Sequence, residues 1–441
     1  MKHLAYFGAQ LDELAKPVAL NQMQELIATL HDAKEYGSIV SVAEYDWDLL
    51  HQFAAEFDIS GEMNLFDSFG IEATQQRLQE LVAVGEVLAQ KYEVVVTNPP
   101  YMGASNMNPK LNEFIKQKYA DYKSDFFSAF IIRASEMTKQ EGYCGFFTPY
   151  VWMFIQSYEK LRKYLYSKAT IETLIQFEYS AFEEATVPVC TFAFKNSYIN
   201  KKGCYLRLVD FRGGMEVQRQ KTLEAISNHN CGFYYEQCSD NFAKIPGAPV
   251  AYWVSEKLAN AFSSSLLYKY AACCTGMQTG NNDAYVRCWY EVNISETTII
   301  NRESAKYQKY NCGGESRKWY GNHIKIVNWN HNGEAVRKEN GSVIRNEKFF
   351  FNEGVTWKRI GSNIITLRYL PAGFIFDQSG DSMFMIGEIN IFFMLGFLNS
   401  KVAMLAFQFI APTMNLTAGN MNKLPIIYQD SKVVNVLVKQ N

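Results

Sequence analysis

The stretch VVVTNPPY at residues 94–101 constrains the fold of this chain more than any other feature, because an apolar run ends there in a rigid polar turn. A helical pattern, TQQRLQELVAVGEVLAQKY, leads directly into it. A continuous apolar run after a helix is typical of a strand covered on both faces in a parallel α/β sheet. We therefore predict a strand at 94–97 that is buried on both faces. The turn at its carboxyl end then lies where open α/β sheets bind ligands.

The sequence downstream continues the alternation of helix and strand. Residues 123–142, KSDFFSAFIIRASEMTKQEG, place apolar side chains on one helical face, with Ser124 as the expected cap and Gly142 as the stop. Further patterns predict, in order, a strand at 143–149, a helix at 157–167, and strands at 171–177 and 187–195. We therefore predict an α/β fold whose twisted, mostly parallel sheet ends in an antiparallel pair.

Changes in the sequence pattern divide the 441 residues into five segments. Before the apolar strand the patterns are helical, and after about Gly203 they become loop-rich. Short β-like runs with Asn/Gly turns then follow and close with a helical stretch. We expect a helical lead-in at 1–92, an α/β core at 93–202, a linker at 203–249, an α+β domain at 250–430 and a tail at 431–441.

Composition argues against several classes of protein. The N-terminal residues contain no long apolar segment of the kind that secretory signals have. The most apolar stretch, 391–410, is interrupted by Asn399, Ser400 and Lys401, so we expect two buried helices there and no membrane span. The nine cysteines form no CxxC pair and the six histidines no HxxxH pair. We therefore expect reduced thiols, a cytoplasmic location and no metal site.

Charge is distributed unevenly, although the net charge is only −2. Residues 1–100 carry 5 Lys/Arg and 16 Asp/Glu, whereas residues 300–370 carry 13 Lys/Arg and 6 Asp/Glu. A basic block inside a near-neutral chain indicates a polyanionic partner. A solvated surface of mixed charge is an alternative that charge alone leaves open.

The turn itself, Asn98-Pro99-Pro100-Tyr101, suits the binding of a flat ring that carries an amino group. The prolines fix φ and lack N–H donors, so Asn98 Oδ1 and the Pro99 carbonyl are expected to accept hydrogen bonds from that group. Tyr101 can stack on the ring, which offsets part of the cost of flipping a base out of a duplex. An amine held in this way can attack an activated methyl group in line. The alternative is a structural turn in which Asn98 caps and Tyr101 packs.

The segment YEVVVTNPPYMG resembles the catalytic motif of N6-adenine DNA methyltransferases, which use S-adenosylmethionine. The helix–strand–helix segment at 125–165 is similar to the one that follows this motif in the family. A later segment, YSAFEEATVPVCTFAF, resembles the motif whose aromatic residue contacts the flipped adenine. The resemblance implies base stacking by Phe182 on the face opposite Tyr101, although from the residues alone Phe182 is equally an ordinary loop anchor.

Segments of the C-terminal half, among them TGMQTGNNDAYVRCWYEV and GGESRKWYGN, look like the target-recognition region of the PglX methyltransferases of BREX phage-defence systems. The resemblance implies double-stranded DNA as the partner, together with other BREX or restriction–modification components. Asn, Gln, Arg and Lys suit base edges and phosphates, and each can also be a solvated loop residue. Our candidates for DNA contacts are Gln278, Thr279, Asn281, Asn282, Arg317, Lys318 and Trp319.

Two features of that family have no counterpart ahead of the turn: the glycine-rich cofactor loop and the acidic residue that holds the ribose. Asp67, in NLFDSFG, is the candidate for the acid. We therefore interpret the chain as a fragment with a partial Rossmann-like class I methyltransferase sheet and a target-recognition domain. Three functions remain open. The first is an adenine methyltransferase that is active when complete or complemented by a missing N-terminal half. The others are a non-catalytic DNA-binding remnant or specificity part of a split enzyme, and an N-methyltransferase of RNA or of protein glutamine.

Overall fold

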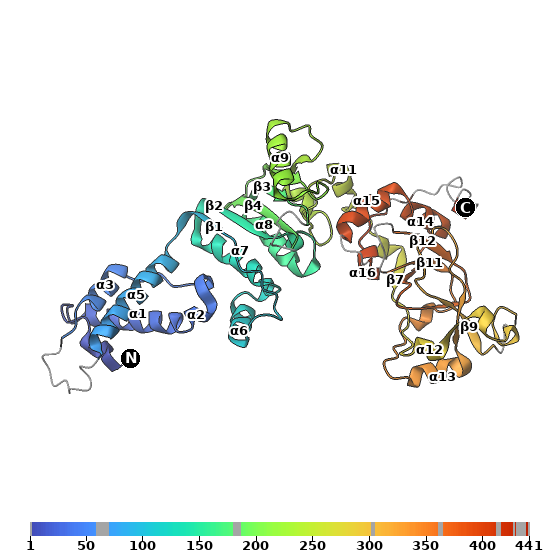
Figure 1. The fold of residues 1–441 in the computed structure, drawn as a ribbon, viewed down its shortest axis with the longest axis horizontal. Coiled ribbons are helices and arrows are strands. Elements are labelled where there is room, and N and C mark those ends of the chain that lie inside the picture. The colour runs from blue at the N-terminus through green and yellow to red at the C-terminus, as the bar shows by residue number, and fades with distance from the viewer. Residues whose placement is uncertain are drawn as a thin grey trace. The chain divides into compact units, whose positions relative to one another are not determined.

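The structure, a computed structural model, describes residues 2–58, 70–179, 187–300, 305–359, 365–411, 416–426, 428 and 438–439. The chain forms two compact units, Met1–Asp240 (unit 1) and Asn241–Asn441 (unit 2) (Figure 1). Each unit contains buried hydrophobic clusters of its own.

The first part of unit 1 is helical. Its elements are the 3-10 helix η1 (Lys2–Tyr6) and the helices α1 (Ala15–Leu30), α2 (Ala33–Tyr36), α3 (Trp47–Ala55) and α5 (Ile71–Ala89). Met23, Leu26, Phe53 and Val82 are completely buried where α1, α3 and α5 pack together. Asp46 caps α3, because its Oδ1 accepts a hydrogen bond from the Leu49 N–H at 3.0 Å.

The centre of unit 1 is a six-stranded sheet with the order β1-β2-β4-β3-β5-β6. Its strands are β1 (Tyr92–Thr97), β2 (Thr138–Pro149), β3 (Thr170–Gln176), β4 (Val189–Lys195), β5 (Lys202–Arg207) and β6 (Tyr234–Cys238). The pairings make β1, β2, β3 and β5 parallel to one another, with β4 and β6 reversed. The predicted mixture of parallel strands with an antiparallel β3–β4 pair is therefore confirmed.

The helices of the sheet region connect its strands and cover it. They are α6 (Pro109–Lys118), α7 (Phe126–Met137), α8 (Glu159–Lys168) and α9 (Gly214–Ser227). Two predicted boundaries of α7 were wrong. Asp125, not Ser124, caps it, because the carboxylate accepts from the Phe127 N–H at 3.2 Å. The helix also stops at Met137 instead of continuing to Gly142, since β2 already begins at Thr138.

The strand β1 is less covered than its apolar run predicted. It stands at the end of the sheet order, and within the described ranges it pairs with β2 alone. Val94 and Val96 are 57% and 75% exposed, so the prediction of a strand buried on both faces is wrong. Side chains alternate between the two faces of a strand. The helix α7 lies against β1, whereas Val94 and Val96 project to the face that stays open.

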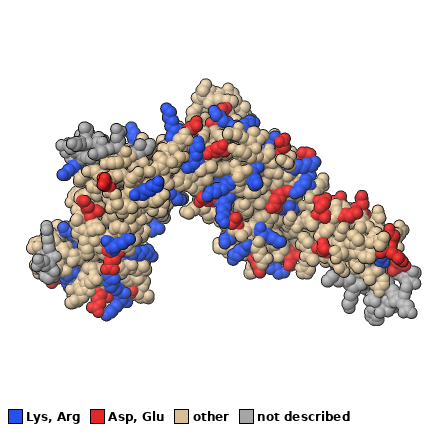
Figure 2. Space-filling view, turned by 180° about the vertical axis from the view of Figure 1, so that it is seen from behind, with Lys and Arg blue, Asp and Glu red and all other residues tan. Residues whose placement is uncertain are grey.

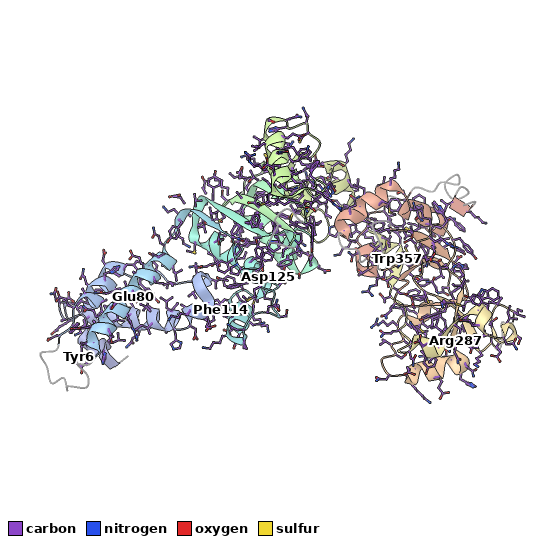
Figure 3. All side chains as sticks on the ribbon, viewed as in Figure 1. Tyr6, Glu80, Phe114, Asp125, Arg287 and Trp357 are labelled. Atoms are coloured by element: carbon purple, nitrogen blue, oxygen red, sulfur yellow. The ribbon has the colours of Figure 1, made fainter. Side chains whose placement is uncertain are left out.

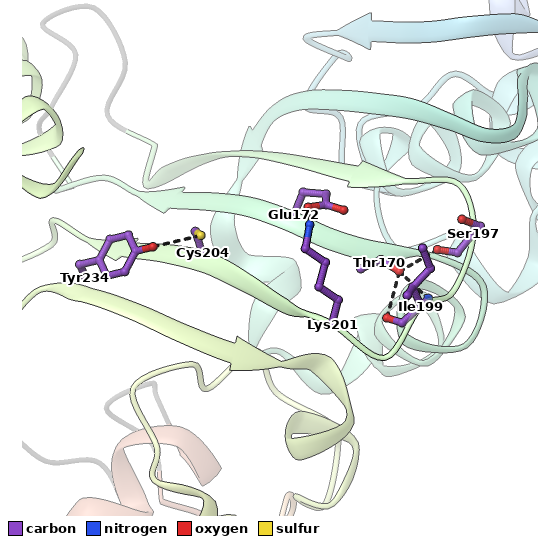
Figure 4. A network of polar contacts seen from close by, with 7 residues as sticks. All are labelled: Thr170, Glu172, Ser197, Ile199, Lys201, Cys204 and Tyr234. Atoms are coloured by element: carbon purple, nitrogen blue, oxygen red, sulfur yellow. Dashed lines mark hydrogen bonds and ion pairs between the residues drawn. The ribbon is translucent and has the colours of Figure 1, made fainter. Parts of the chain in front are cut away.

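Residues 203–249 were expected to be a linker, but most of them belong to unit 1. They contain nearly all of β5, all of α9 and all of β6, and their apolar residues Leu206, Leu208, Ala225 and Phe233 form a buried cluster. Polar contacts also hold the segment just before β5 to β3 (Figure 4). Lys201 pairs with Glu172 at 2.8 Å, and the Ile199 N–H donates to Thr170 Oγ1 at 2.7 Å. The division between the units therefore falls after β6, at Asp240.

Unit 2 is an α+β unit with two four-stranded sheets, of order β13-β9-β10-β8 and β12-β11-β14-β7. Its strands are β7 (Ala271–Cys274), β8 (Val286–Cys288), β9 (Tyr307–Asn311), β10 (Lys325–Asn328), β11 (Gly354–Trp357), β12 (Leu367–Leu370), β13 (Phe374–Phe376) and β14 (Ser382–Met385). Its helices are α11 (Glu256–Ala261), α12 (Asn282–Tyr285), α13 (Asn330–Lys338), α14 (Ile391–Leu398), α15 (Lys401–Ile410) and α16 (Ala418–Met421), while α10 (Ser239–Ala243) lies across the division. Trp357 is fully buried in its core (Figure 3).

The apolar stretch at 391–410 forms the two short helices that the sequence predicted. Among the described residues no single helix is long and apolar enough to cross a membrane. The helices α14 and α15 meet that test only as a pair, and they are bent by 61° at the break between them. Met394, Leu398, Ala403 and Phe407 place these helices in the core of unit 2. All nine cysteines are free thiols.

Candidate active site and nucleic-acid interface

The turn Asn98–Tyr101 lies at the carboxyl edge of the unit 1 sheet. It follows β1 directly, and Thr97 pairs with Phe146 of the parallel strand β2. The carboxyl end of β2, at Pro149, therefore lies close to the turn. At this edge of an α/β sheet the side chains that follow neighbouring parallel strands converge, which makes it the expected place for a ligand.

Hydrogen bonds fix the shape of the turn. The Tyr101 hydroxyl donates to Asn98 Oδ1 at 2.9 Å and lies 3.2 Å from the Phe147 carbonyl, a second acceptor. Asn98 and Pro100 are exposed, while Pro99 is buried. Burial, and next the thiol of Cys190, raises the pKa of Tyr101 to about 12. The hydroxyl therefore stays protonated and keeps its role as a donor across the physiological pH range.

The Tyr101 ring is supported by aromatic residues of α7 and of the segment before α8. It meets Phe127 edge to face, with 6.5 Å between the ring centroids, and Phe127 in turn stacks on Tyr158 at 5.5 Å. These contacts anchor the ring to α7 and to the segment before α8. The residue is still 36% exposed, so part of the aromatic surface remains available for stacking on a planar ligand.

Asp125 is a residue of this site that the sequence analysis missed. Its Oδ1 accepts hydrogen bonds from the Met102 N–H at 3.0 Å and from the Phe127 N–H at 3.2 Å. The Phe126 N–H donates back to the Met102 carbonyl at 3.0 Å. The residue after the turn is thus tied to the first turn of α7 (Figure 3). The pattern Ser-Asp before an apolar helix contained this information, but we assigned the cap to Ser124.

Two predicted site residues, Asp67 and Phe182, lie outside the described residues. No residue is therefore assigned to the cofactor in this structure. A cavity of about 440 Å³ lies elsewhere, lined by Ser135 of α7, Tyr164 of α8 and Asn196 after β4. Because α7 and α8 end where β2 and β3 begin, this cavity is at the amino edge of the sheet, opposite the turn. We attach the chemistry to the turn, where the acceptor groups and the aromatic ring converge.

Four of the DNA-contact candidates lie around the start of α12 in unit 2. A cavity of about 150 Å³ is lined by Gln278, Thr279 and Asn282. Thr279 is buried and its hydroxyl donates to Asn282 Oδ1 at 2.6 Å, while Asn281 caps α12 by accepting from the Ala284 N–H at 3.1 Å. Thr279 and Asn281 therefore have local structural roles, and Gln278 is the candidate whose side chain makes no hydrogen bond in the described part of the chain.

The other candidates, Arg317, Lys318 and Trp319, lie on the loop between β9 and β10. Arg317 and Lys318 are exposed, and within the described ranges no carboxylate pairs with either. Trp319 is held by its backbone instead, because its N–H donates to the Leu367 carbonyl at 3.0 Å and its carbonyl accepts from Tyr369 at 2.7 Å. Its half-buried ring packs on the core, so Trp319 is mainly structural.

The two groups of candidates adjoin the same tight turn at 377–380. The Gln378 N–H donates to the Met277 carbonyl at 3.1 Å, next to Gln278, and Ser379 Oγ accepts from the Gly313 N–H at 3.0 Å, in the loop that carries Arg317. Elsewhere on unit 2, Lys338 pairs with Glu334 at 2.6 Å and Arg337 pairs with Glu347, and basic and acidic side chains intermingle in the view of Figure 2.

The first part of the chain, residues 10–182, matches the family described as Eco57I restriction-modification methylase. The order of the sheet, with β4 reversed between β2 and β3, and the α+β unit that follows define a partial class I methyltransferase fold with a second domain, as the sequence predicted.

Two sequence relatives indicate the kind of methyltransferase more narrowly than the family match does. The adenine-specific methyltransferase PglX of Lacticaseibacillus casei (strain Zhang) is 33% identical over 95% of this chain and 36% of its own length. The adenine-specific methyltransferase BrxX of Escherichia coli O9:H4 (strain HS) is 32% identical over 92% of this chain and 33% of its own length. By sequence the chain is therefore related to the adenine-specific methyltransferases PglX and BrxX, and the resemblance seen in its motifs is confirmed.

The chain spans about a third of the length of these curated relatives. Among solved structures, the Type IIL restriction-modification enzyme MmeI in complex with DNA is 11% identical, with a TM-score of 0.48 over 97% of this chain and 62% of that one.

Proposed function

We propose that this chain supplies the acceptor site and the DNA-recognition unit of a site-specific adenine DNA methyltransferase. The proposed reaction transfers a methyl group from S-adenosylmethionine to N6 of an adenine flipped out of duplex DNA, in restriction–modification or phage defence. The observation that carries the proposal is the turn Asn98–Tyr101 at the carboxyl edge of the sheet, tied to α7 by Asp125. The sequence relatives, which are adenine-specific methyltransferases, support the choice of acceptor.

In the proposed complex, Asn98 Oδ1 and the Pro99 carbonyl accept hydrogen bonds from the adenine amino group. An amide oxygen has two lone pairs, and the Tyr101 hydroxyl occupies only one of those on Asn98 Oδ1. When both amino hydrogens donate to these two acceptors, the lone pair of the amino nitrogen faces the methyl donor. The turn thus contributes by positioning the nucleophile. The Tyr101 ring offers a stacking surface for the base, worth roughly 1–3 kcal/mol.

The proposed partner of unit 2 is double-stranded DNA, with Arg317 and Lys318 contacting phosphate and Gln278 placed near the same tight turn. Other BREX or restriction–modification components, or a polypeptide that completes the cofactor side, belong to the same proposal. Such a polypeptide enters the test below as a separate arm.

The test is transfer of a labelled methyl group to duplex DNA by the full chain. It is measured alone and together with any polypeptide encoded directly upstream. We expect Asn98→Ala to lower the rate by roughly 100-fold or more, the scale seen when one polar group that stabilises a transition state is removed. Tyr101→Phe is the matched control, because it keeps the ring and leaves Asn98 Oδ1 free. Full activity in Asn98→Ala would refute the assigned chemistry.

A second candidate function is a non-catalytic DNA-binding or specificity module. The exposed cations Arg317 and Lys318 favour it, because binding to DNA phosphates would explain them without any catalytic role. This function predicts salt-sensitive DNA binding with no heat of binding for S-adenosylmethionine in calorimetry. A clear cofactor isotherm would count against it. RNA or a glutamine-bearing peptide as the better methyl acceptor would instead favour the third function that the turn allows.

A further inference from the structure

The side chain of Arg368, in β12 of unit 2, is buried, and no carboxylate of the described residues pairs with it. Its exposed fraction is 0%. Its Nη2 donates to the Cys312 carbonyl at 3.4 Å, whereas Nε and Nη1 have no hydrogen-bond partner among the described residues. A guanidinium carries five donors in a fixed fork and is costly to bury unless these are paired. Arg368 therefore has unused hydrogen-bond donors and a positive charge that no described carboxylate neutralises.

The groups around Arg368 are also basic. The guanidinium of Arg317 lies near enough to act on it, and burial followed by this neighbour lowers the pKa of Arg368 to about 10. His323 is adjacent, with a buried Nε2 that has no partner in the described part of the chain. Burial, followed by Arg368 and Lys309, lowers the pKa of His323 to about 4. Arginine, histidine and lysine side chains thus converge without a paired carboxylate.

The cover of this cluster is the loop at 312–323, between β9 and β10. The loop is attached to β12 on both sides of Arg368, because the Trp319 N–H donates to the Leu367 carbonyl and the Trp319 carbonyl accepts from the Tyr369 N–H. One residue of the loop has an unfavourable conformation, because Trp319 has a left-handed φ of 71°, which a bulky side chain disfavours. Its outer part, Gly314–Lys318, is exposed, so a ligand can reach Arg317 from solvent on the outer side of this loop.

We infer that Arg317, His323 and Arg368 form a binding site for a phosphate group, with Arg317 as the outer contact and Arg368 as the charge beneath. In the occupied state the loop at 312–323 shifts so that the free nitrogens of Arg368 reach the anion. Phosphate suits this site because the arginine fork matches two of its oxygens and the anion neutralises the buried charge. The inference rests on the proposed function in one respect, which is that we assign the phosphate to the backbone of DNA. Free inorganic phosphate offers the same chemistry and is the alternative source.

The test compares full-length wild type with Arg368→Met and Arg317→Gln. Replacing a buried, uncompensated charge by an apolar side chain of similar length removes its cost. We therefore expect Arg368→Met to unfold at a higher temperature than wild type and yet to bind duplex DNA more weakly. A lost phosphate contact also lowers the slope of log affinity against log salt by about 1. Arg317→Gln removes an exposed charge that repels Arg368, so it should show the same weaker binding and lower slope with an unfolding temperature no lower than that of wild type.

Lys257→Gln, at an exposed position of α11 in unit 2, is the control for general loss of charge. A second arm measures the unfolding temperature with inorganic phosphate in place of DNA. Stabilisation of wild type but not of Arg368→Met by phosphate supports the site. If wild type binds no DNA in that case, the proposed function loses its DNA partner and free phosphate is the ligand. If wild type binds DNA and both variants bind equally well, the site is refuted while the proposed function stands. A lower unfolding temperature for Arg368→Met, with unchanged binding by Arg317→Gln, would also refute the site.

Discussion

Asp125 joins two segments that must stay together for the turn to keep its shape, since Met102 and Phe127 both donate to its Oδ1. The carboxylate is also partly desolvated. Burial raises the pKa of Asp125, and the backbone hydrogen bonds from Met102, Phe127 and Phe126 oppose that effect without cancelling it. The acceptor oxygen is therefore useful to the fold, while the negative charge is a cost.

We predict that Asp125→Ala lowers the free energy of unfolding by about 1–2 kcal/mol, as expected for a lost N-cap, and that Asp125→Asn loses less because it keeps an acceptor oxygen. A pKa raised in the folded state means that the folded chain holds the proton more tightly. The contribution of this group is therefore greatest below the ordinary value of 3.8 and falls as the pH rises through the raised pKa. As the pH rises from about 3 to about 6, denaturant titrations should show the free energy of unfolding of wild type falling relative to that of Asp125→Asn. Equal losses in the Ala and Asn variants would mean that the charge itself is required.

The sequence sufficed for residues whose role depends on a local pattern. Asn98, Pro99, Pro100 and Tyr101 could be placed on one turn because the prolines fix the backbone there, and the structure has them at the carboxyl end of β1. It did not suffice where a role depends on distant partners. Arg368 was not selected because nothing in its own neighbourhood reveals that the 312–323 loop covers it.

At the level of elements, β1 is the least protected strand of the unit 1 sheet. A run such as Val94–Thr97 has the same composition whether a strand is central or at an edge, so the sequence could not reveal that Val94 and Val96 face outward. The segment at 203–249 was misjudged for a related reason: β5 and β6 are short and polar on one face, and only their partners in the sheet make them strands. The helices α5 and α7 were recognised from their periodicity, whereas β2 was predicted only from residue 143 onward and its first residues were assigned to the preceding helix.

An exposed apolar edge strand invites pairing with other chains. We predict that Val96→Lys leaves the free energy of unfolding within about 0.5 kcal/mol of wild type, because the side chain is 75% exposed, and slows aggregation measured by light scattering. Val95→Lys is the matched control, since Val95 is half-buried on the other face and should lose stability. If Val96→Lys aggregates as fast as wild type, the exposed edge of β1 is not the surface through which the chain aggregates.

At the level of the whole molecule, the two units have separate cores. Phe53 is fully buried in the helical part of unit 1, and Trp357 is fully buried in unit 2, where its Nε1 donates to the Leu416 carbonyl at 2.8 Å. Every strand pairing and every isolated β-bridge among the described residues joins residues of the same unit. Each unit is therefore expected to unfold on its own.

We predict that Trp357→Ala costs roughly 3–5 kcal/mol in unit 2 and accelerates amide hydrogen exchange there, while exchange in β2 and β4 of unit 1 stays unchanged. Phe53→Ala is the reciprocal variant and should affect the helical part of unit 1 alone. Exchange that accelerates throughout the chain in either variant would instead mean that the two units unfold together.

The division at Asp240 also bears on how such proteins diversify. A recombination event between β6 and β7 would exchange unit 2 for that of a relative without breaking a strand pairing of either unit. The acceptor turn in unit 1 would be inherited intact, while the loops of unit 2 would arrive as a set that already packs on its own core. Under the proposed function, such an exchange would give a lineage a new target preference in a single genetic step.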